Sequence, residues 1–131
     1  MTITGPAPGI RTLVFDVLGT VVDEAGSLAA ETAAALATAG IGPDRARELS
    51  REWTGRVDEL IAQIAAGEAP WRSNDELRLV ALLDAVQAVD LDELDPEVLE
   101  DLALAGHRLR PWPDSARAVQ ALAGEIGRAH V

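Results

Sequence analysis

The hydrophobic pattern of the chain changes once, near residue 23. Leu13-Val14-Phe15 is a short apolar run with no charge before Asp16. Such a run is typical of a strand buried on both faces, as in a parallel sheet covered by helices. After Asp23 the apolar positions recur at helical spacing almost to the end of the sequence. We therefore predict an α/β fold in which this chain supplies one strand and is otherwise mostly α-helical.

Four helices are predicted between residues 24 and 107, and a fifth after Ser115, up to Gly124. The first four starts are marked, in order, by Gly26-Ser27, Pro43, the capping box Ser73-Asn74-Asp75-Glu76, and Asp95-Pro96. The second helix is expected to bury Leu49, Trp53, Val57, Leu60 and Ile64, and the third Leu79, Leu82, Leu83 and Val86. Trp53 and Trp71 are expected to pack inside this helical segment, and Trp112 to brace the hinge that leads from it back to the core.

No second strand is predicted anywhere in the sequence. A strand cannot satisfy its own backbone N–H and C=O groups, so the strand at Leu13 to Phe15 needs neighbours. The sequence as given does not supply them. We therefore expect an incomplete sheet core.

Chemistry is concentrated where the predicted strand ends. Asp16 is placed at its carboxyl end, the edge at which open α/β sheets bind ligands. Gly19 permits a tight turn, and the Thr20 hydroxyl can orient a neighbouring carboxylate. An ordinary strand followed by an Asx-type turn would contain similar residues.

The pattern Phe15-Asp16-x-x-Gly19-Thr20-Val21-x-Asp23 resembles the first motif of the haloacid dehalogenase superfamily. Strand, carboxylate, Gly-Thr turn and following helices together favour this family over a plain turn. The resemblance implies a Rossmann-like core with an inserted helical cap. It also implies that Asp16 is a nucleophile that forms a covalent intermediate, held in line by Thr20. Asp23 is expected to cap or brace the turn rather than take part in catalysis.

A helical insert directly after the first strand, followed by Pro111-Trp112-Pro113-Asp114-Ser115, resembles the type II 2-haloacid dehalogenase branch. We accordingly expect a first core segment at residues 1–23, a four-helix cap at 24–107 and a return to the core at 108–124. The resemblance implies a small 2-haloacid as the substrate. It also leaves open that the full-length parent protein forms a homodimer.

Leu18 occupies the position at which the phosphatases of the superfamily carry a second Asp, which acts as a general acid. A leucine supplies no proton, whereas a halide leaves as a stable anion and needs none. Leu18 therefore points to displacement at a carbon–halogen bond and lines the expected substrate site. No metal is implied for this branch, and Mg²⁺ enters only if the protein is a phosphatase.

A haloacid is an anion, so the cap is expected to supply a cation. Dehalogenases of this branch carry an Arg directly after a Trp on the long cap helix, but here Trp53 precedes Thr54. The nearest candidate is Arg56, at the border of the apolar stripe. It either reaches inward to a substrate carboxylate or halide, or is a solvated border residue.

Charge and composition limit the classes of binding partner that we expect. The chain of 131 residues has 22 acidic residues against 11 basic ones, for a formal net charge of −11. Such a chain is repelled by phosphate backbones and anionic lipid surfaces, which argues against nucleic acid and membranes. It has no cysteine, and its N-terminus lacks the features of a signal peptide. A cytoplasmic protein is expected.

His107 is expected to interact with carbonyls at a helix end, and the acidic run 90–95 to be a solvated junction.

The heptapeptide at 125–131 looks like the frame translation of a sequencing adapter. We hypothesise that native sequence stops near Gly124 and expect the 131-residue chain to be inactive alone and poorly soluble. Two alternatives stay open for function: a phosphatase-like hydrolase of the same superfamily, and a non-catalytic helical interaction module.

Overall fold

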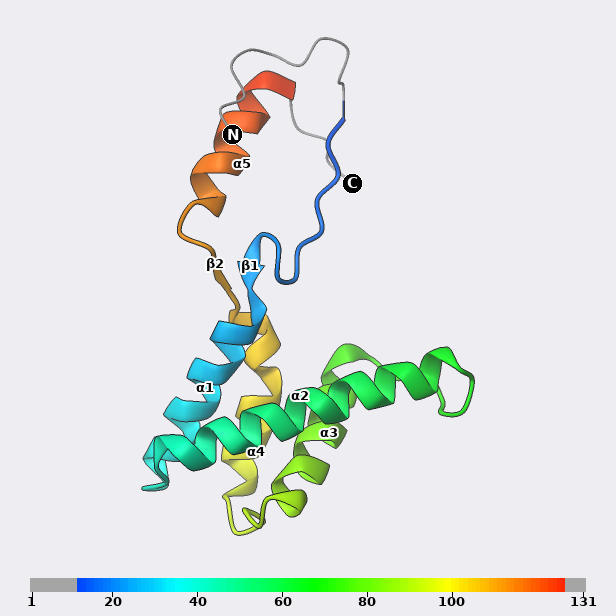
Figure 1. The fold of residues 1–131 in the computed structure, drawn as a ribbon, viewed down its shortest axis with the longest axis vertical. Coiled ribbons are helices and arrows are strands. Elements are labelled where there is room, and N and C mark those ends of the chain that lie inside the picture. The colour runs from blue at the N-terminus through cyan, green and yellow to red at the C-terminus, as the bar shows by residue number, and fades with distance from the viewer. Residues whose placement is uncertain (1–11, 127–131) are drawn as a thin grey trace. The chain divides into compact units, whose positions relative to one another are not determined.

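The computed structural model describes residues 12–126, which divide into two compact units. Glu24–Leu109 forms the helical unit, and the segments that flank it, up to Asp23 and from Arg110 onward, form the flanking unit. The chain thus leaves the flanking unit once, builds the helical unit, and returns (Figure 1). No helix in the described part of the chain is long and apolar enough to cross a membrane.

The helical unit contains α1 (Glu24–Thr38), α2 (Pro43–Ala65), α3 (Asn74–Ala88) and α4 (Pro96–Ala103), followed by a 3₁₀ turn, η1 (Leu104–Arg108). Pro43 is the first residue of α2, where its missing N–H does no harm because the first N–H groups of a helix have no partner within the helix. Ser73 and Glu76 form the predicted capping box at α3, and the Ser73 bonds lower the pKa of Glu76. Asp95 caps α4 by accepting the Glu97 N–H. Local sequence signals therefore set three of the four helix starts.

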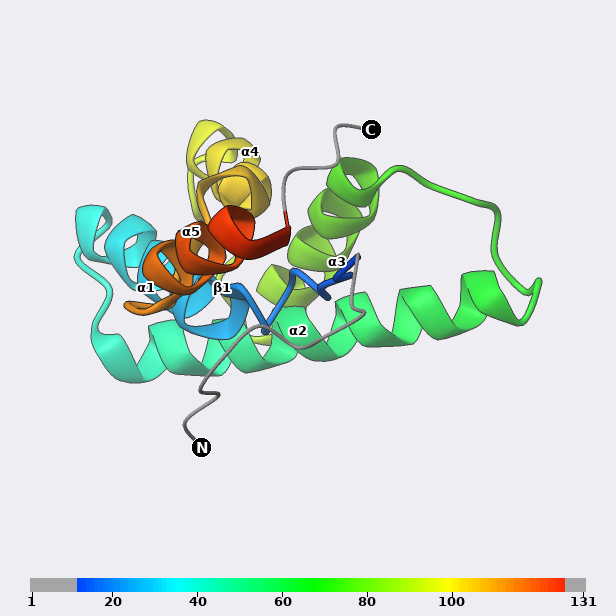
Figure 2. The same cartoon turned by 90° about the horizontal axis from the view of Figure 1, so that it is seen from above.

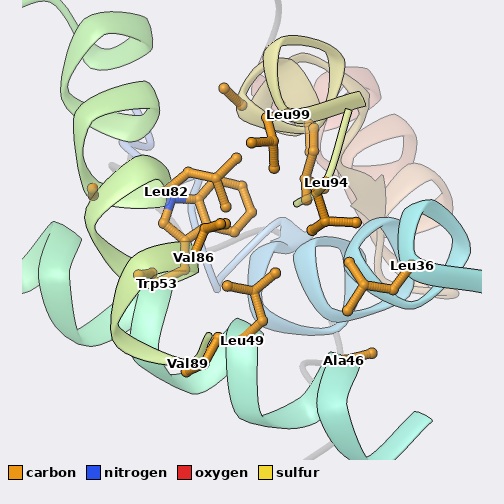
Figure 3. Close-up of a cluster of buried hydrophobic side chains, with 14 of the residues drawn as sticks. Leu36, Ala46, Leu49, Trp53, Leu82, Val86, Val89, Leu94 and Leu99 are labelled. Carbon is orange, nitrogen blue, oxygen red and sulfur yellow. The ribbon is translucent and has the colours of Figure 1, made fainter. Parts of the chain in front are cut away.

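The core of the helical unit lies where all four helices meet. Figure 2 shows the long α2 with α1 and α3 packed against it, and α4 packs on α1 and α3. The labelled side chains of Figure 3 come from these helices and the adjoining loops and point toward one another. The largest fully buried apolar side chains are Leu36, Leu49, Leu82 and Leu102. This interior holds the helices together by burying apolar surface.

Several details of this unit differ from the sequence prediction. Gly26 and Ser27 lie inside α1, because the helix begins at Glu24 immediately after the strand. Leu83 is half exposed, and Ala81 and Ala85 are buried instead, since these smaller residues allow α3 to pack closely. Trp71 is 79% exposed and does not pack inside the unit.

Charged side chains also tie the helical unit together. Arg108 of η1 donates to Glu31 of α1 and to Asp101 of α4, with Nε to Oε2 and Nη2 to Oδ2 both at 3.0 Å. The hydrogen bond to Glu31 raises the pKa of Arg108. His107 Nε2 lies 2.9 Å from Asp75 Oδ1 on α3, so a carboxylate is its partner here rather than the terminal carbonyls we expected. These contacts fasten the end of the unit to its earlier helices.

A buried arginine of α3 that the sequence pattern did not reveal, Arg78, pairs with Glu24 at the start of α1. The Arg78 side chain is 7% exposed, and its Nη2 donates to Glu24 Oε1 at 2.5 Å. Its Nε is buried without a hydrogen-bond partner in the described structure. Gly106 lies against it, so close that a Cβ there would come 3.3 Å from Nε. The carbonyl of Arg78 accepts the indole N–H of Trp53 at 3.0 Å.

The flanking unit contains β1 (Val22–Asp23), β2 (Arg110–Pro111) and α5 (Ser115–Ile126). The two short strands are antiparallel, with Val22 opposite Pro111 and Asp23 opposite Arg110 (Figure 1). The predicted strand at Leu13 to Phe15 is wrong for this chain, because these residues form no strand and Val14 is 91% exposed. Strand pairing needs a neighbour, and none of the described residues provides one here. The observed pair, β1 and β2, was missed because each strand has two residues and no apolar alternation.

Candidate active site

The candidate site is built on a tight turn that follows Asp16. The carbonyl of Val17 accepts the N–H groups of Thr20, Val21 and Val22, and the Gly19 N–H donates back to Val22 O at 3.0 Å. Gly19 has a φ of 77°, a left-handed conformation that costs a glycine little. The backbone conformation of the turn thus explains why the motif has a glycine at position 19.

The turn brings Asp16 and Thr20 together, as expected from the sequence. The Thr20 hydroxyl donates to Asp16 Oδ2 at 2.7 Å, a short bond of the kind made to a charged acceptor. The bond occupies one carboxylate oxygen and fixes the direction of the other. Asp16 itself is exposed, so its second oxygen is accessible to a small molecule. An oriented, accessible carboxylate can act as a nucleophile.

Leu18 lies two residues beyond Asp16 on the same turn and is 53% exposed. It is one of several large apolar residues exposed beside the carboxylate, together with Phe15 and Val17. The chain neighbours of Asp16 are therefore apolar and exposed to solvent, and no proton donor occupies the Leu18 position.

The segment after β2 supports the turn from outside, a role that the sequence assigned only loosely to Trp112. The Trp112 indole N–H donates to Gly19 O at 3.2 Å, and its backbone N–H donates to Val21 O at 3.2 Å. The Ser115 hydroxyl also donates to Val21 O, at 2.6 Å. The Pro-Trp-Pro-Asp-Ser run marked this segment in the sequence. It did not reveal the contacts with the turn, because the contacted residues lie more than 90 positions away.

Arg56 lies on α2, in the helical unit, and its charge is already engaged. Its Nε donates to Glu52 Oε1 at 2.9 Å, and Nη1 lies 3.9 Å from Glu59 Oε2. The side chain is 39% exposed, as at the border of a helix stripe. Two acidic neighbours on its own helix are the partners of Arg56 in this structure, and both are partly solvated.

Two open grooves are found on the helical unit, and neither is lined by a predicted site residue. One lies between α1 and the start of α2 and is bordered by Arg47, Ser50 and Arg51. The other lies over the acidic run after α3, with Asp90, Asp92 and Glu93 at its edge. Among residues 12–126, no three His, Cys, Asp or Glu side chains gather in a way that would hold a metal ion.

Comparisons with known proteins define the class. Protein-family models give no match, and neither do the curated proteins. Two crystal structures do match. The defluorinating L-2-haloacid dehalogenase Rha0230 matches with a TM-score of 0.78 and 30% identity, over 88% of this chain and 48% of that one. The L-2-haloacid dehalogenase PA0810 matches with a TM-score of 0.74 and 31% identity, over 89% of this chain and 49% of that one.

The fold of the chain is thus similar to part of the haloacid dehalogenase fold. The structures it resembles belong to the L-2-haloacid dehalogenases, which confirms the resemblance to the type II branch. The chain spans about half the length of these two proteins.

Proposed function

We propose that the chain carries the nucleophile of a hydrolase that displaces halide from a small 2-haloacid. The observation that carries the proposal is the 2.7 Å hydrogen bond from Thr20 to Asp16 on a Gly-Thr turn. It leaves one oriented and exposed carboxylate oxygen for attack. The likeness to two L-2-haloacid dehalogenases supports the choice of substrate class.

The reaction proceeds in two steps. In the first, an oxygen of Asp16 bonds to C2 of the haloacid while the carbon–halogen bond breaks, and the halide leaves with the bonding electron pair. In the second, water adds to the carbonyl carbon of the new ester. The bond between that carbon and the substrate-bearing oxygen then breaks, which releases a 2-hydroxy acid, restores the Asp16 carboxylate and gives one proton to the solvent.

The apolar residue at position 18 suits this chemistry better than phosphoryl transfer. A phosphate monoester must release an alkoxide, which needs a proton from a general acid. Leu18 offers none, whereas halide departure requires none. No metal is assigned to the reaction. A phosphatase, which would require Mg²⁺, remains the second enzymatic candidate from the sequence.

Although we expect no turnover from the 131-residue chain alone, the first step can be tested in it, because a single alkylation event per chain is sufficient. The protein is incubated with excess 2-bromopropionate, quenched in acid, digested and mapped by mass spectrometry. We expect an ester on Asp16 in the wild type, none in Asp16→Asn, and slower formation in Thr20→Val. Labelling spread over the other carboxylates without preference for Asp16 would contradict the proposal.

A parallel arm separates the two enzymatic candidates. Acetyl phosphate with Mg²⁺ replaces the haloacid, and the same peptide is examined for an aspartyl phosphate. Phosphorylation of Asp16 in the absence of any ester from 2-bromopropionate would favour the phosphatase. Neither product on Asp16, with the chain folded by circular dichroism, would favour a non-catalytic interaction module.

A further inference from the structure

The carbonyls of the Asp16 turn are held by a segment almost one hundred residues later in the sequence. Within the turn, Val17 O and Val22 O accept the backbone N–H groups, whereas the carbonyls of Gly19 and Val21 accept from donors outside it. Three donors from residues 112–115 take them: the Trp112 indole N–H, the Trp112 backbone N–H and the Ser115 hydroxyl. A carbonyl has two lone pairs, so Val21 O can accept both of its bonds at once.

We propose that Trp112 and Ser115 are positioning residues for Asp16, acting through the turn that carries Thr20. This inference rests on the proposed function, since it concerns the alignment of the same nucleophile. Thr20 lies between the two clamped carbonyls, so the bonds on either side of it limit its movement. The hydroxyl that orients the carboxylate is thereby fixed from both flanks.

The clamp is itself rigidly mounted. Trp112 stands between Pro111 and Pro113, and a residue before proline is restricted to extended backbone. Ser115 is the first residue of α5 and is buried, with its N–H donating to Trp112 O at 3.1 Å. β2 pairs with β1 immediately before the clamp, which sets the register of the two segments. The donors therefore come from backbone that Pro113, the start of α5 and the pairing of β2 with β1 all restrain.

The alternative is that these bonds only add stability to the flanking unit. The two roles differ in what they change. A stabilising contact alters the fraction of folded protein, whereas a positioning contact alters the rate at which folded protein reacts. Loss of alignment should lower the maximal rate of Asp16 alkylation and leave the haloacid concentration for half-maximal rate unchanged.

The experiment compares Ser115→Ala and Trp112→Phe with the wild-type chain in two measurements. The first is amide hydrogen exchange by NMR at Gly19, Val21 and Val22. The second is the rate of Asp16 ester formation across a range of 2-bromopropionate concentrations. Loss of one hydrogen bond is expected to speed exchange at these amides and slow maximal alkylation by about three- to tenfold. Ser115→Thr keeps the hydroxyl and is expected to recover most of the rate.

Trp71→Phe and Ser50→Ala are the matched controls, because they make the same chemical changes in the helical unit. Both are expected to leave exchange and alkylation in the flanking unit unchanged. Unaltered exchange at the turn in Ser115→Ala and Trp112→Phe would overturn the inference, and so would a rate that falls only in proportion to the unfolded fraction. If the wild type forms no ester, the proposed function fails, and with it the catalytic part of this inference. Exchange then still decides whether the clamp holds the turn.

Discussion

We predict that removing Glu24 from its buried ion pair with Arg78 destabilises the fold more than removing Arg78 does. The Arg78 side chain is 7% exposed, whereas that of Glu24 is 28% exposed. Removing the carboxylate in Glu24→Gln leaves a guanidinium that is buried and without a countercharge, in addition to the Nε that already lacks a partner. Removing the guanidinium in Arg78→Met leaves a carboxylate that water can reach.

The magnitudes follow from this difference in burial. Breaking a fully buried pair costs about 3–5 kcal/mol, and partial solvation of Glu24 reduces this to about 2–3 kcal/mol for Glu24→Gln. Arg78→Met keeps most of the apolar packing and eliminates the unpartnered Nε, so we expect a cost of about 1 kcal/mol. The double variant is expected to be within about 1 kcal/mol of the wild type, because no charge is then left buried alone.

Urea unfolding of the full chain measures these free energies, followed by circular dichroism and by tryptophan fluorescence. Trp53 is a suitable reporter, since it is buried and its indole N–H bonds to Arg78 O. Arg78→Met as destabilising as Glu24→Gln would refute the argument from unequal burial. A double variant that loses the sum of the two single costs would show that the pair is not coupled.

Three further predictions concern the helical unit. Leu82→Ala, at a fully buried position, is expected to cost about 2–5 kcal/mol in urea unfolding, whereas Leu83→Ala, at a half-exposed one, should stay within about 0.5 kcal/mol. Ser73→Ala removes the α3 cap and is expected to cost about 1 kcal/mol; an unchanged midpoint would contradict the capping role. The pKa of Glu76 is lower in the folded chain than in the unfolded one, which stabilises the fold at pH values above the ordinary pKa of a glutamate. This stabilisation is lost as the pH falls through the lowered pKa. Between about pH 5 and pH 3, Glu76→Gln should therefore lose less stability than the wild type, and equal acid sensitivity would refute the assignment.

The features that sequence predicted well are the ones decided by neighbouring residues. The capping box at Ser73 and the Thr20 bond to Asp16 each join residues three or four positions apart. The buried stripe of α2 was also predictable at Leu49 and Trp53, because helical periodicity places them on one face.

The features that sequence missed depend on distant parts of the chain. Arg78 pairs with a residue 54 positions earlier, so its position in α3 gave no sign that it would be buried. The contacts of Ser115 with the Asp16 turn are equally remote. The strand expected at Leu13 failed for a related reason, because a suitable sequence becomes a strand only beside a partner. Trp71 shows that a large aromatic residue alone does not establish burial.

The pairing of β1 with β2 has a consequence for how such a protein can be altered. Asp23 and Arg110 are cross-strand partners, so the two ends of the 86-position span Glu24–Leu109 attach to neighbouring points of the flanking unit. Segments whose ends lie close together are tolerated as insertions, because their removal or exchange asks little of the chain on either side. The helical unit is therefore suited to replacement as a cassette, by a short turn or by the equivalent helices of another protein, while Asp16, Thr20 and their supporting segment keep their own connections.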